Sequence, residues 1–345
     1  MKKILFAAAA IAAALFASCD KTDDTLDPAM PETSDTARIA ITLTGADEAD
    51  TRAFFDTSAK AEAEAWESSL SSLSVFAFDN SGALIIRRDF TSSELASKSA
   101  TFALPKSAAG TECSFYAVAN YDASSAKTRA ALTALVEKSA ADYNGTFAEV
   151  SSAAKRSGGF VMSGSTSKTI GAVNSTTSVG ITLKRTVAKV ALQTTIDPSF
   201  ADKYAGELTI NSVKLSKAAS QSSVVAGTPT PGAMSYTHTQ TLAAASGKYN
   251  ALFYCFENGS LTAGNRVLLE INATYDLDGN GSTTDDRSEV TYSVELTGKA
   301  AGEILRNGYY RIAANITGLV GQDCAVTVTV ADWETPVTQS VELGA

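Results

Sequence analysis

Apolar and polar residues alternate in the stretch Arg38-Ile39-Ala40-Ile41-Thr42-Leu43-Thr44-Gly45. Successive side chains of a β-strand point to opposite faces of the sheet. This stretch therefore predicts a strand with one buried face, formed by Ile39, Ile41 and Leu43, and one polar face. The glycine at its end marks the start of a loop.

Strand patterns of this kind fill most of the remaining chain. Leu73–Phe78 and Ala83–Ile86 flank the turn residues Asp79-Asn80-Ser81-Gly82, which predicts a hairpin. The pattern breaks in Ser125–Lys138, where helical spacing predicts a short helix with a serine at 124 or 125 as its N-cap. Further strands are predicted at Cys113–Asn120, Gly159–Gly164, Val179–Leu183, Arg185–Leu192, Leu208–Leu215, Tyr249–Phe256, Arg266–Tyr275, Ser288–Leu296, Tyr309–Ile316, Ala325–Val330 and Pro336–Leu343.

The N-terminus has the features of an export signal. Two lysines precede an apolar run from Ile4 to Phe16, which is too short to span a bilayer. Small residues then precede Cys19, as in a lipobox, where the thiol is acylated and the chain is cut before it. Residues 1–18 are therefore predicted to be a signal peptide and Cys19 the lipidation site. The acidic stretch 19–37 is predicted to be a disordered tether.

Short strands at this spacing, with a single helix, predict an all-β fold of two β-sandwich domains in tandem. The helix belongs to the first domain, and Asp197-Pro198 marks a break in the strand pattern. We place the boundary so that residues 38–190 form the N-terminal domain and residues 191–345 the C-terminal domain. The chain is long enough for two domains of ordinary size.

Composition excludes several classes of function. The net charge is −9 and no basic cluster occurs, which argues against nucleic-acid binding and against electrostatic attachment to anionic lipid. The single histidine, His238, lies in an alternating segment and is expected at the surface. No GxSxG, HExxH or P-loop motif is present, so we predict neither an enzyme nor a bound cofactor. Cys113, Cys255 and Cys324 are widely separated and are expected to be buried free thiols.

Five passages follow one another in a fixed order behind the lipobox: Phe115–Asn120, Val161–Gly164, Leu183–Val190, Leu305–Ile312 and Val328–Trp333. Each alone is merely strand-like. In this order they resemble the fimbrillin family, the lipoprotein-derived pilins of Bacteroidetes. The resemblance implies two transthyretin-like β-sandwich domains. It also implies a structural subunit of a cell-surface fimbria that joins other copies of itself or related pilins and supports adhesion.

The resemblance further implies maturation by an arginine-specific protease, which cuts in a loop after the first strand. Arg52 is the only basic residue between Arg38 and Lys60, in an acidic stretch that a protease could reach. A cut between Arg52 and Ala53 would release the lipid and the removable segment 38–52. Arg38 is the competing site, and a cut there would remove the tether but leave the strand in place.

The physical consequence of such a cut is strand exchange. While present, the first strand is expected to cap a sheet and to bury Ile39, Ile41 and Leu43, each contributing roughly 1.5–3 kcal/mol. Removing it would leave an apolar groove and an open sheet edge, and an open edge recruits another strand.

The C-terminal segment has the pattern of a donor strand. Its apolar face carries Val337, Val341 and Leu343, interrupted by the polar Gln339. Placed in the groove of the next subunit, it would give a head-to-tail filament. The alternative is that this segment is simply the last strand of its own domain.

Asp276, Asp278 and Asn280 match the first half of a calcium-binding loop. Arg287 occupies the position where such a loop needs a bidentate Glu. Asp-Gly and Asn-Gly are also ordinary turn signals, so we favour an acidic turn without a tightly bound metal.

These patterns favour an outer-membrane lipoprotein exported to the cell surface, held by lipid at Cys19 until it is cut and then built into a fimbria. A second hypothesis is a surface-anchored lipoprotein that stays monomeric and binds a ligand such as a glycan. No cluster of aromatic residues, which would favour that second hypothesis, is visible in the sequence.

Overall fold

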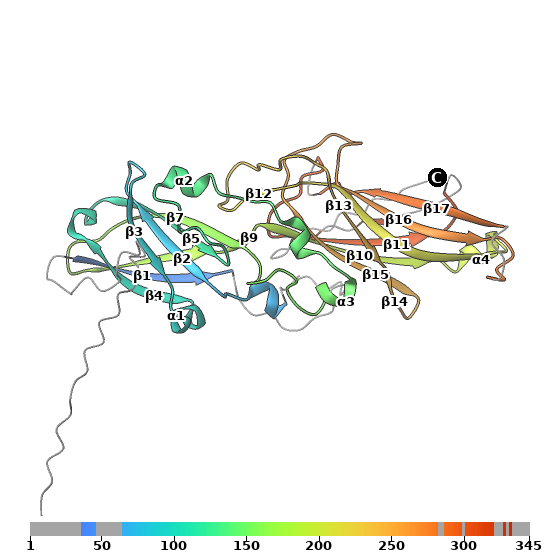
Figure 1. The fold of residues 1–345 in the computed structure, drawn as a ribbon, viewed down its shortest axis with the longest axis horizontal. Helices are drawn as coiled ribbons and strands as arrows, with labels where there is room; N and C mark the ends of the chain where they lie inside the picture. Colours follow the sequence, from blue (N-terminus) through green and yellow to red (C-terminus); the bar gives the residue numbers. More distant parts are fainter. Residues whose placement is uncertain are drawn as a thin grey trace, which may run out of the picture.

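The computed structural model describes residues 36–45, 64–281, 286–298, 301–320, 327–328 and 331–332. In this part of the chain, short strands form several sheets and the helices are short, which confirms the predicted all-β fold. The sheets lie in two groups along the long axis of the molecule (Figure 1). No helix among the described residues is both long and apolar enough to cross a membrane.

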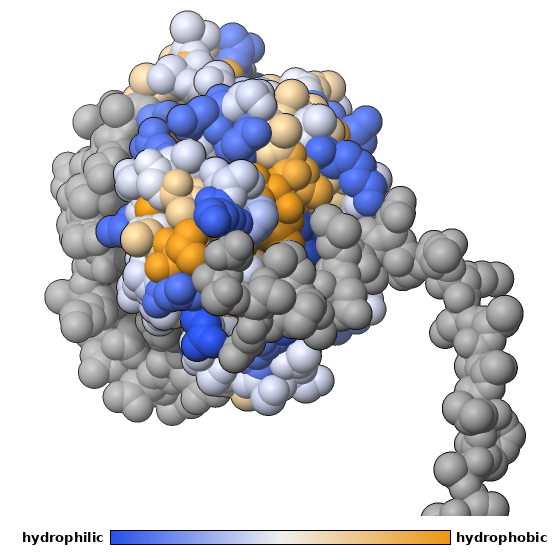
Figure 2. Space-filling view, turned by 90° about the vertical axis from the view of Figure 1, so that its left-hand side faces the viewer, coloured by the Kyte–Doolittle hydropathy of each residue, from blue (hydrophilic) through white to orange (hydrophobic). Residues whose placement is uncertain are grey.

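The first group of sheets forms a sandwich around one apolar cluster. A three-stranded sheet has the order β4-β1-β8, and a five-stranded sheet has the order β3-β2-β5-β7-β9. Alternating apolar residues of both sheets meet between them. The strands are β1 (Thr36–Thr44), β2 (Leu73–Phe78), β3 (Leu84–Asp89), β4 (Ser99–Pro105), β5 (Glu112–Ala119), β7 (Met162–Thr169), β8 (Thr176–Thr182) and β9 (Lys184–Arg185). Seen from this end, hydrophilic residues surround two apolar areas (Figure 2).

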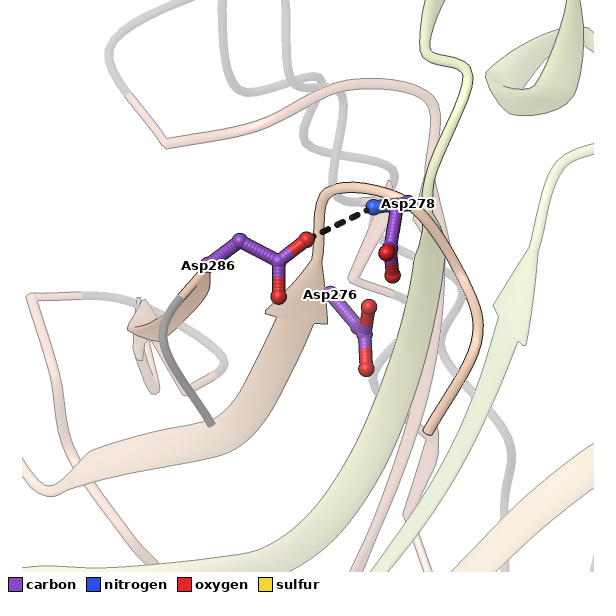
Figure 3. A group of neighbouring side chains, drawn as sticks. All are labelled: Asp276, Asp278 and Asp286. Atoms are coloured by element: carbon purple, nitrogen blue, oxygen red, sulfur yellow. Dashed lines mark hydrogen bonds between the residues drawn. The ribbon is translucent and has the colours of Figure 1, made fainter. Parts of the chain in front are cut away.

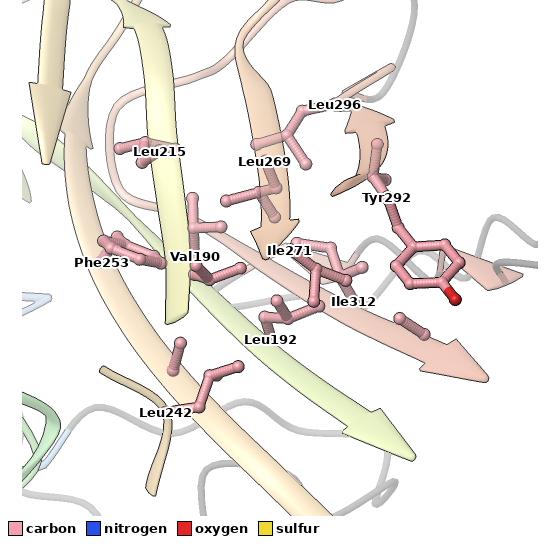
Figure 4. Packing of buried hydrophobic residues seen from close by; sticks show 14 of the residues in the cluster. Val190, Leu192, Leu215, Leu242, Phe253, Leu269, Ile271, Tyr292, Leu296 and Ile312 are labelled. Carbon is pink, nitrogen blue, oxygen red and sulfur yellow. The ribbon is translucent and has the colours of Figure 1, made fainter. Parts of the chain in front are cut away.

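The second group repeats this arrangement. One sheet has the order β14-β15-β10-β18-β19, with β20 also pairing β18, and the other has the order β13-β11-β16-β17. Val190, Leu192 and Phe253 of the first sheet point toward Leu215 and Ile271 of the second (Figure 4). The strands are β10 (Val187–Ile196), β11 (Glu207–Ala218), β13 (Tyr236–Thr241), β14 (Ala243–Ala245), β15 (Lys248–Phe256), β16 (Leu268–Asp276), β17 (Arg287–Glu295), β18 (Gly308–Ile316), β19 (Thr327–Val328) and β20 (Ala331–Asp332).

The chain passes from the first sandwich to the second between β9 and β10, a region that we call the junction. β10 begins at Val187 and pairs with β15 and β18 of the second sandwich. The boundary predicted at 190 and 191 therefore falls inside this strand, four residues after its start. The division into domains 38–190 and 191–345 stays a prediction.

Short elements cover the outside of the sheets. They are η1 (Ala65–Ser68), α1 (Ser92–Ser97), η2 (Lys106–Ala108), α2 (Arg129–Thr133), β6 (Val136–Glu137), η3 (Ala140–Tyr143), α3 (Phe147–Val150), α4 (Ser199–Lys203) and β12 (Ser222–Ser223). The segment between β5 and β7 carries α2, β6, η3 and α3. Its side chains pack on the first sandwich through Leu132 and on the second through Tyr143.

The predicted helix at Ser125–Lys138 is shorter than expected. It forms α2, and its N-cap is Thr128, whose Oγ1 accepts a hydrogen bond from the Ala131 N–H at 3.1 Å. The helix cannot continue to residue 138 because Val136 and Glu137 pair with Ser223 and Ser222 as strand β6. This pairing partner lies far away in sequence, which is why helical spacing alone overestimated the length.

Gly164 of β7 lies directly against the end of β8 in the facing sheet. A Cβ there would lie 2.1 Å from the Thr182 carbonyl oxygen and 2.8 Å from Ile181 Cγ2. We expect Gly164→Ala to destabilise the fold by about 1–3 kcal/mol, because backbone must move to admit the methyl group. Gly180→Ala, on neighbouring β8, is the control, since a Cβ there has no atom within 4 Å. Equal urea midpoints for the two variants would contradict this expectation.

Candidate assembly site

The first strand occupies the centre of its sheet. Ile39 and Ile41 are 0% and 1% exposed, and Leu43 and Ala37 lie on the same buried face. β1 pairs antiparallel with β4, from Thr36 opposite Pro105 to Thr42 opposite Ser99, and parallel with β8 over its other edge. The predicted burial of this face is therefore observed.

The expectation that this strand caps a sheet is wrong, because β1 has a neighbour on both sides. The missed neighbour is β4, whose sequence Ser99-Ala100-Thr101-Phe102-Ala103-Leu104 does alternate polar and apolar residues. That alternation could have identified it as a strand. We call the space that β1 fills between β4 and β8 the slot.

Backbone contacts hold both ends of β1 in the slot. At its start, the Asn174 N–H donates to the Thr36 carbonyl oxygen at 3.0 Å, and at its end the Leu183 N–H donates to Thr44 at 2.9 Å. Gly45 follows with φ of +81°, and a Cβ there would lie 2.4 Å from the Leu183 carbonyl oxygen. A glycine is therefore required where the chain leaves the slot.

Several predicted site residues lie outside the described part of the chain. They are Cys19, Arg52, Ala53, Val337, Val341 and Leu343, together with Cys324. Their roles in lipidation, cleavage and strand donation stay predictions. The described chain stops at Gly45 and resumes at Glu64, just before η1.

η1 anchors this resumed chain at the junction through a buried ion pair. Glu67 is 0% exposed, and its Oε1 lies 2.8 Å from Nζ of Lys189 on β10, which is 1% exposed. The same oxygen accepts a 2.5 Å hydrogen bond from the Tyr254 hydroxyl. Burial lowers the pKa of Lys189, and Glu67 opposes this effect. The pair therefore joins the chain just before β2 to the second sandwich.

Arg185 extends this network across the junction. Its Nε donates to the Glu67 carbonyl oxygen at 2.7 Å, its Nη1 to Asn307 Oδ1 at 2.9 Å and its Nη2 to Ser68 Oγ at 3.1 Å. Arg185 and Asn307 come from two of the passages that carried the family resemblance. The structure brings these passages together, although sequence reasoning gave them no shared role.

Two further ion pairs with buried carboxylates lie near the junction. Glu137 contacts Arg156 at 3.2 Å and accepts a 2.8 Å hydrogen bond from Thr186 Oγ1. Arg306 donates from Nε to Glu257 Oε2 at 3.0 Å and also bonds the carbonyl oxygen of Ser223. Sequence reasoning missed all these residues. The available signal was a charged side chain inside an otherwise apolar strand pattern, as for Lys189.

The candidate ion-binding residues form an acidic turn. Asp276, Asp278 and Asp286 have carboxylate oxygens within 4.8 Å of one another (Figure 3). Protein donors already occupy Asp276, which accepts from the Gly279 N–H at 2.9 Å and pairs with Arg287 at 3.2 Å. Asn280 donates its amide N–H to Asp278 instead of facing outward as a ligand. Asp286, which the calcium-loop pattern did not select, completes the cluster.

The described cysteines and the single histidine lie in positions where they pack against the protein interior. Cys113 and Cys255 are buried and free, and burial raises the pKa of the Cys255 thiol to about 12, which leaves it protonated. His238 lies on β13 as expected, but it is half-buried, with Nε2 at 3.1 Å from the Gly145 carbonyl oxygen.

Comparison with known proteins identifies the architecture. Residues 37–193 match the family described as the major fimbrial subunit protein, FimA. By this match residues 37–193 are similar to the fimbrillin family, in agreement with the predicted resemblance. The matched region contains the slot and the buried junction residues Arg185 and Lys189. No curated protein matches the chain in sequence.

Solved structures share the fimbrillin fold at low sequence identity. A proposed cell adhesion protein from Bacteroides eggerthii is 18% identical, with a TM-score of 0.56 over 90% of this chain and 96% of its own. The tip fimbrial protein Mfa3 from Porphyromonas gingivalis, with a C-terminal truncation, is 14% identical, with a TM-score of 0.56 over 86% of this chain and 100% of its own. A fimbrial assembly protein from Parabacteroides distasonis is 15% identical, with a TM-score of 0.50 over 88% and 99%.

These relationships confirm the β-sandwich fold and the predicted family. Fimbrillins are structural fimbrial or adhesion proteins rather than enzymes. The match to the fimbrial family supports a place in a cell-surface fimbria and association with other fimbrial subunits.

Proposed function

We propose that this protein is a structural fimbrial subunit, exported as a lipoprotein acylated at Cys19, cut after Arg52 and polymerised by strand exchange. The observation that carries the proposal is the central place of β1 in its sheet. Removal of a strand at the edge of a sheet would break hydrogen bonds along only one side of that strand. The loss of β1 separates β4 from β8 and exposes two strand edges and the apolar side chains beneath them.

The position of the cut follows from what holds each arginine. Arg38 lies within β1, where it pairs with Ala103 on one side and Thr176 on the other. A protease must draw an extended backbone into its active site, and this paired backbone is not free to enter. Arg52 lies between the end of β1 and η1. A cut there frees β1, while Glu67 keeps the new N-terminal region attached at the junction.

The pattern of the C-terminus fits the slot in a defined register. We place Val341 and Leu343 where Ile39 and Ile41 lie in the uncut chain, with the donor running in the direction of β1. Gln339 then falls at the position of Ala37, near the start of the slot. Ala37 is itself buried, so in this register the Gln339 amide must take hydrogen bonds there.

The mass and N-terminus of the protein recovered from the cell surface test this proposal. We expect a chain that begins at Ala53, carries no lipid and runs as an SDS-resistant ladder. Arg52→Gln should leave an acylated monomer that still begins at Cys19, whereas Arg38→Gln should mature normally. If the unsubstituted protein remains an acylated monomer, the proposal is overturned. If only Arg38→Gln blocks maturation, the protease cuts after Arg38 and not after Arg52.

A further inference from the structure

A cavity of about 500 Å³ opens at one end of the five-stranded sheet in the first sandwich. It lies between the start of β2, the end of β3, the start of α1 and the loops after β5 and before β7. This volume is within the range of pockets that hold small ligands. The slot and the acidic turn do not use it, and Arg156, which pairs with Glu137 near the junction, also lines it.

The floor of this cavity is rigid. Asn120 has φ of +58°, and its side-chain oxygen accepts from the N–H of Ser71 at 2.8 Å, while its amide nitrogen donates to the carbonyl oxygens of Ser69 and Phe160. Arg156 donates to the Asn120 carbonyl oxygen at 3.0 Å. Loops from three parts of the chain are thereby fixed around one amide, so the cavity exists before any ligand enters.

The charges on its wall are balanced against each other. Arg87 contacts Asp89 through two bonds, with Nε at 3.0 Å from Oδ1 and Nη2 at 2.5 Å from Oδ2. Asp122 is a second carboxylate on the same wall. Burial alone would raise the pKa of Asp89, but bonds from Arg87 and Ser74 hold it below its ordinary value. With Arg156 in the floor, two guanidiniums face two carboxylates, so the cavity offers no net attraction for an anion.

Polar groups remain for a ligand to use. The hydroxyls of Ser72, Ser92 and Ser157 line the cavity, and among the described residues none of them has a hydrogen-bond partner. Tyr121 also lines the cavity. It is half-buried, packs against the apolar cluster of Phe76 and Phe78, and has its hydroxyl 3.3 Å from the Val136 carbonyl oxygen. Hydroxyls and carboxylates bind groups that both donate and accept, and an aromatic ring covers an apolar face.

We propose that this cavity binds a neutral sugar unit. Sugar hydroxyls both donate and accept, and the carbon–hydrogen face of a sugar ring can lie on Tyr121. The balanced charges disfavour an acidic ligand, and the serine-rich wall disfavours an apolar one. This proposal goes beyond fimbrial assembly, because the site is formed in the uncut chain and holds whether or not the chain polymerises.

The test uses the uncut chain from residue 20 in saturation-transfer NMR and calorimetry. The probes are methyl glycosides of mannose, galactose, glucose and N-acetylglucosamine, with N-acetylneuraminic acid as the acidic comparison. We expect at least one neutral sugar to bind with a Kd of about 1 mM or lower. Asp122→Asn should weaken this binding at least about tenfold, and Ser157→Phe, which fills the cavity from an exposed position, should abolish it.

Asp202→Asn on α4 is the matched control, since it removes an exposed carboxylate at the far end of the second sandwich. It should leave sugar binding unchanged. Absence of binding by every neutral probe, tighter binding of N-acetylneuraminic acid, or binding that Ser157→Phe does not reduce would each overturn the proposal. This result does not depend on assembly, because sugar binding is measured on the uncut chain whereas assembly is measured on the cut chain.

Discussion

A chain that begins at Ala53 is expected to leave the monomeric state, whereas a chain that begins at Thr36 is expected to stay monomeric. The shorter chain lacks β1, so β4 and β8 lose their shared partner. The buried side chains of Ile39, Ile41 and Leu43 together contribute on the order of 5–9 kcal/mol. A chain without them can regain that burial only from a strand of another copy. Light scattering and SDS-resistant ladders measure the outcome.

A synthetic peptide spanning residues 36–45 provides the control. Added in excess to the chain that begins at Ala53, it should fill the slot and keep the chain monomeric. The same peptide with Ile39→Asn and Ile41→Asn should fail, because it would place two amides in an apolar site. If the shorter chain stays monomeric and folded without any peptide, then β1 is dispensable and strand exchange has no driving force.

Lys189→Met is expected to lower the free energy of unfolding of the uncut chain by about 3–5 kcal/mol. The substitution leaves Glu67 buried at 0% exposure without its ammonium partner. The hydrogen bond from Tyr254 remains, but a single hydroxyl does not replace a positive charge. Urea unfolding followed by fluorescence measures the change.

Two further variants separate this effect from loss of packing. Glu67→Gln combined with Lys189→Met removes both charges, and the double variant should be more stable than the sum of the single losses predicts. Lys155→Met breaks the exposed ion pair with Glu149, which lies at 2.6 Å, and should leave the unfolding midpoint almost unchanged. Equal losses for Lys189→Met and Lys155→Met would show that burial of the pair does not matter.

The strand pattern was largely predictable because alternation is a local property. β2 has the bounds that alternation predicts, and the ends of β1, β5, β11 and β16 lie within three residues of the predicted ranges. β4 was missed although Ala100, Phe102 and Leu104 alternate, and without it β1 was expected at an edge. The order of strands in a sheet depends on contacts between distant segments, so alternation does not determine it.

The junction illustrates a second limit. Lys189 interrupts an apolar strand, and a lone charge there signals a buried partner, but the sequence does not say which carboxylate supplies it. Glu67 is separated from it by more than a hundred residues and lies in a short turn of helix. The cavity beside Asn120 could not be predicted either, because its serines are spread over three segments that the fold brings together.

The placement of β1 has a consequence for mass action. Gly45 and Glu64 are joined by residues 46–63, so β1 remains covalently linked to the slot it fills. Such a link gives a strand an effective concentration in the millimolar range, far above that of a strand on another molecule. Cutting the link breaks none of the contacts of β1. The cut turns an intramolecular equilibrium into a bimolecular one. Once β1 leaves the slot it is diluted into the surroundings, and the slot is filled by whichever strand has the higher concentration at the growing end of the filament.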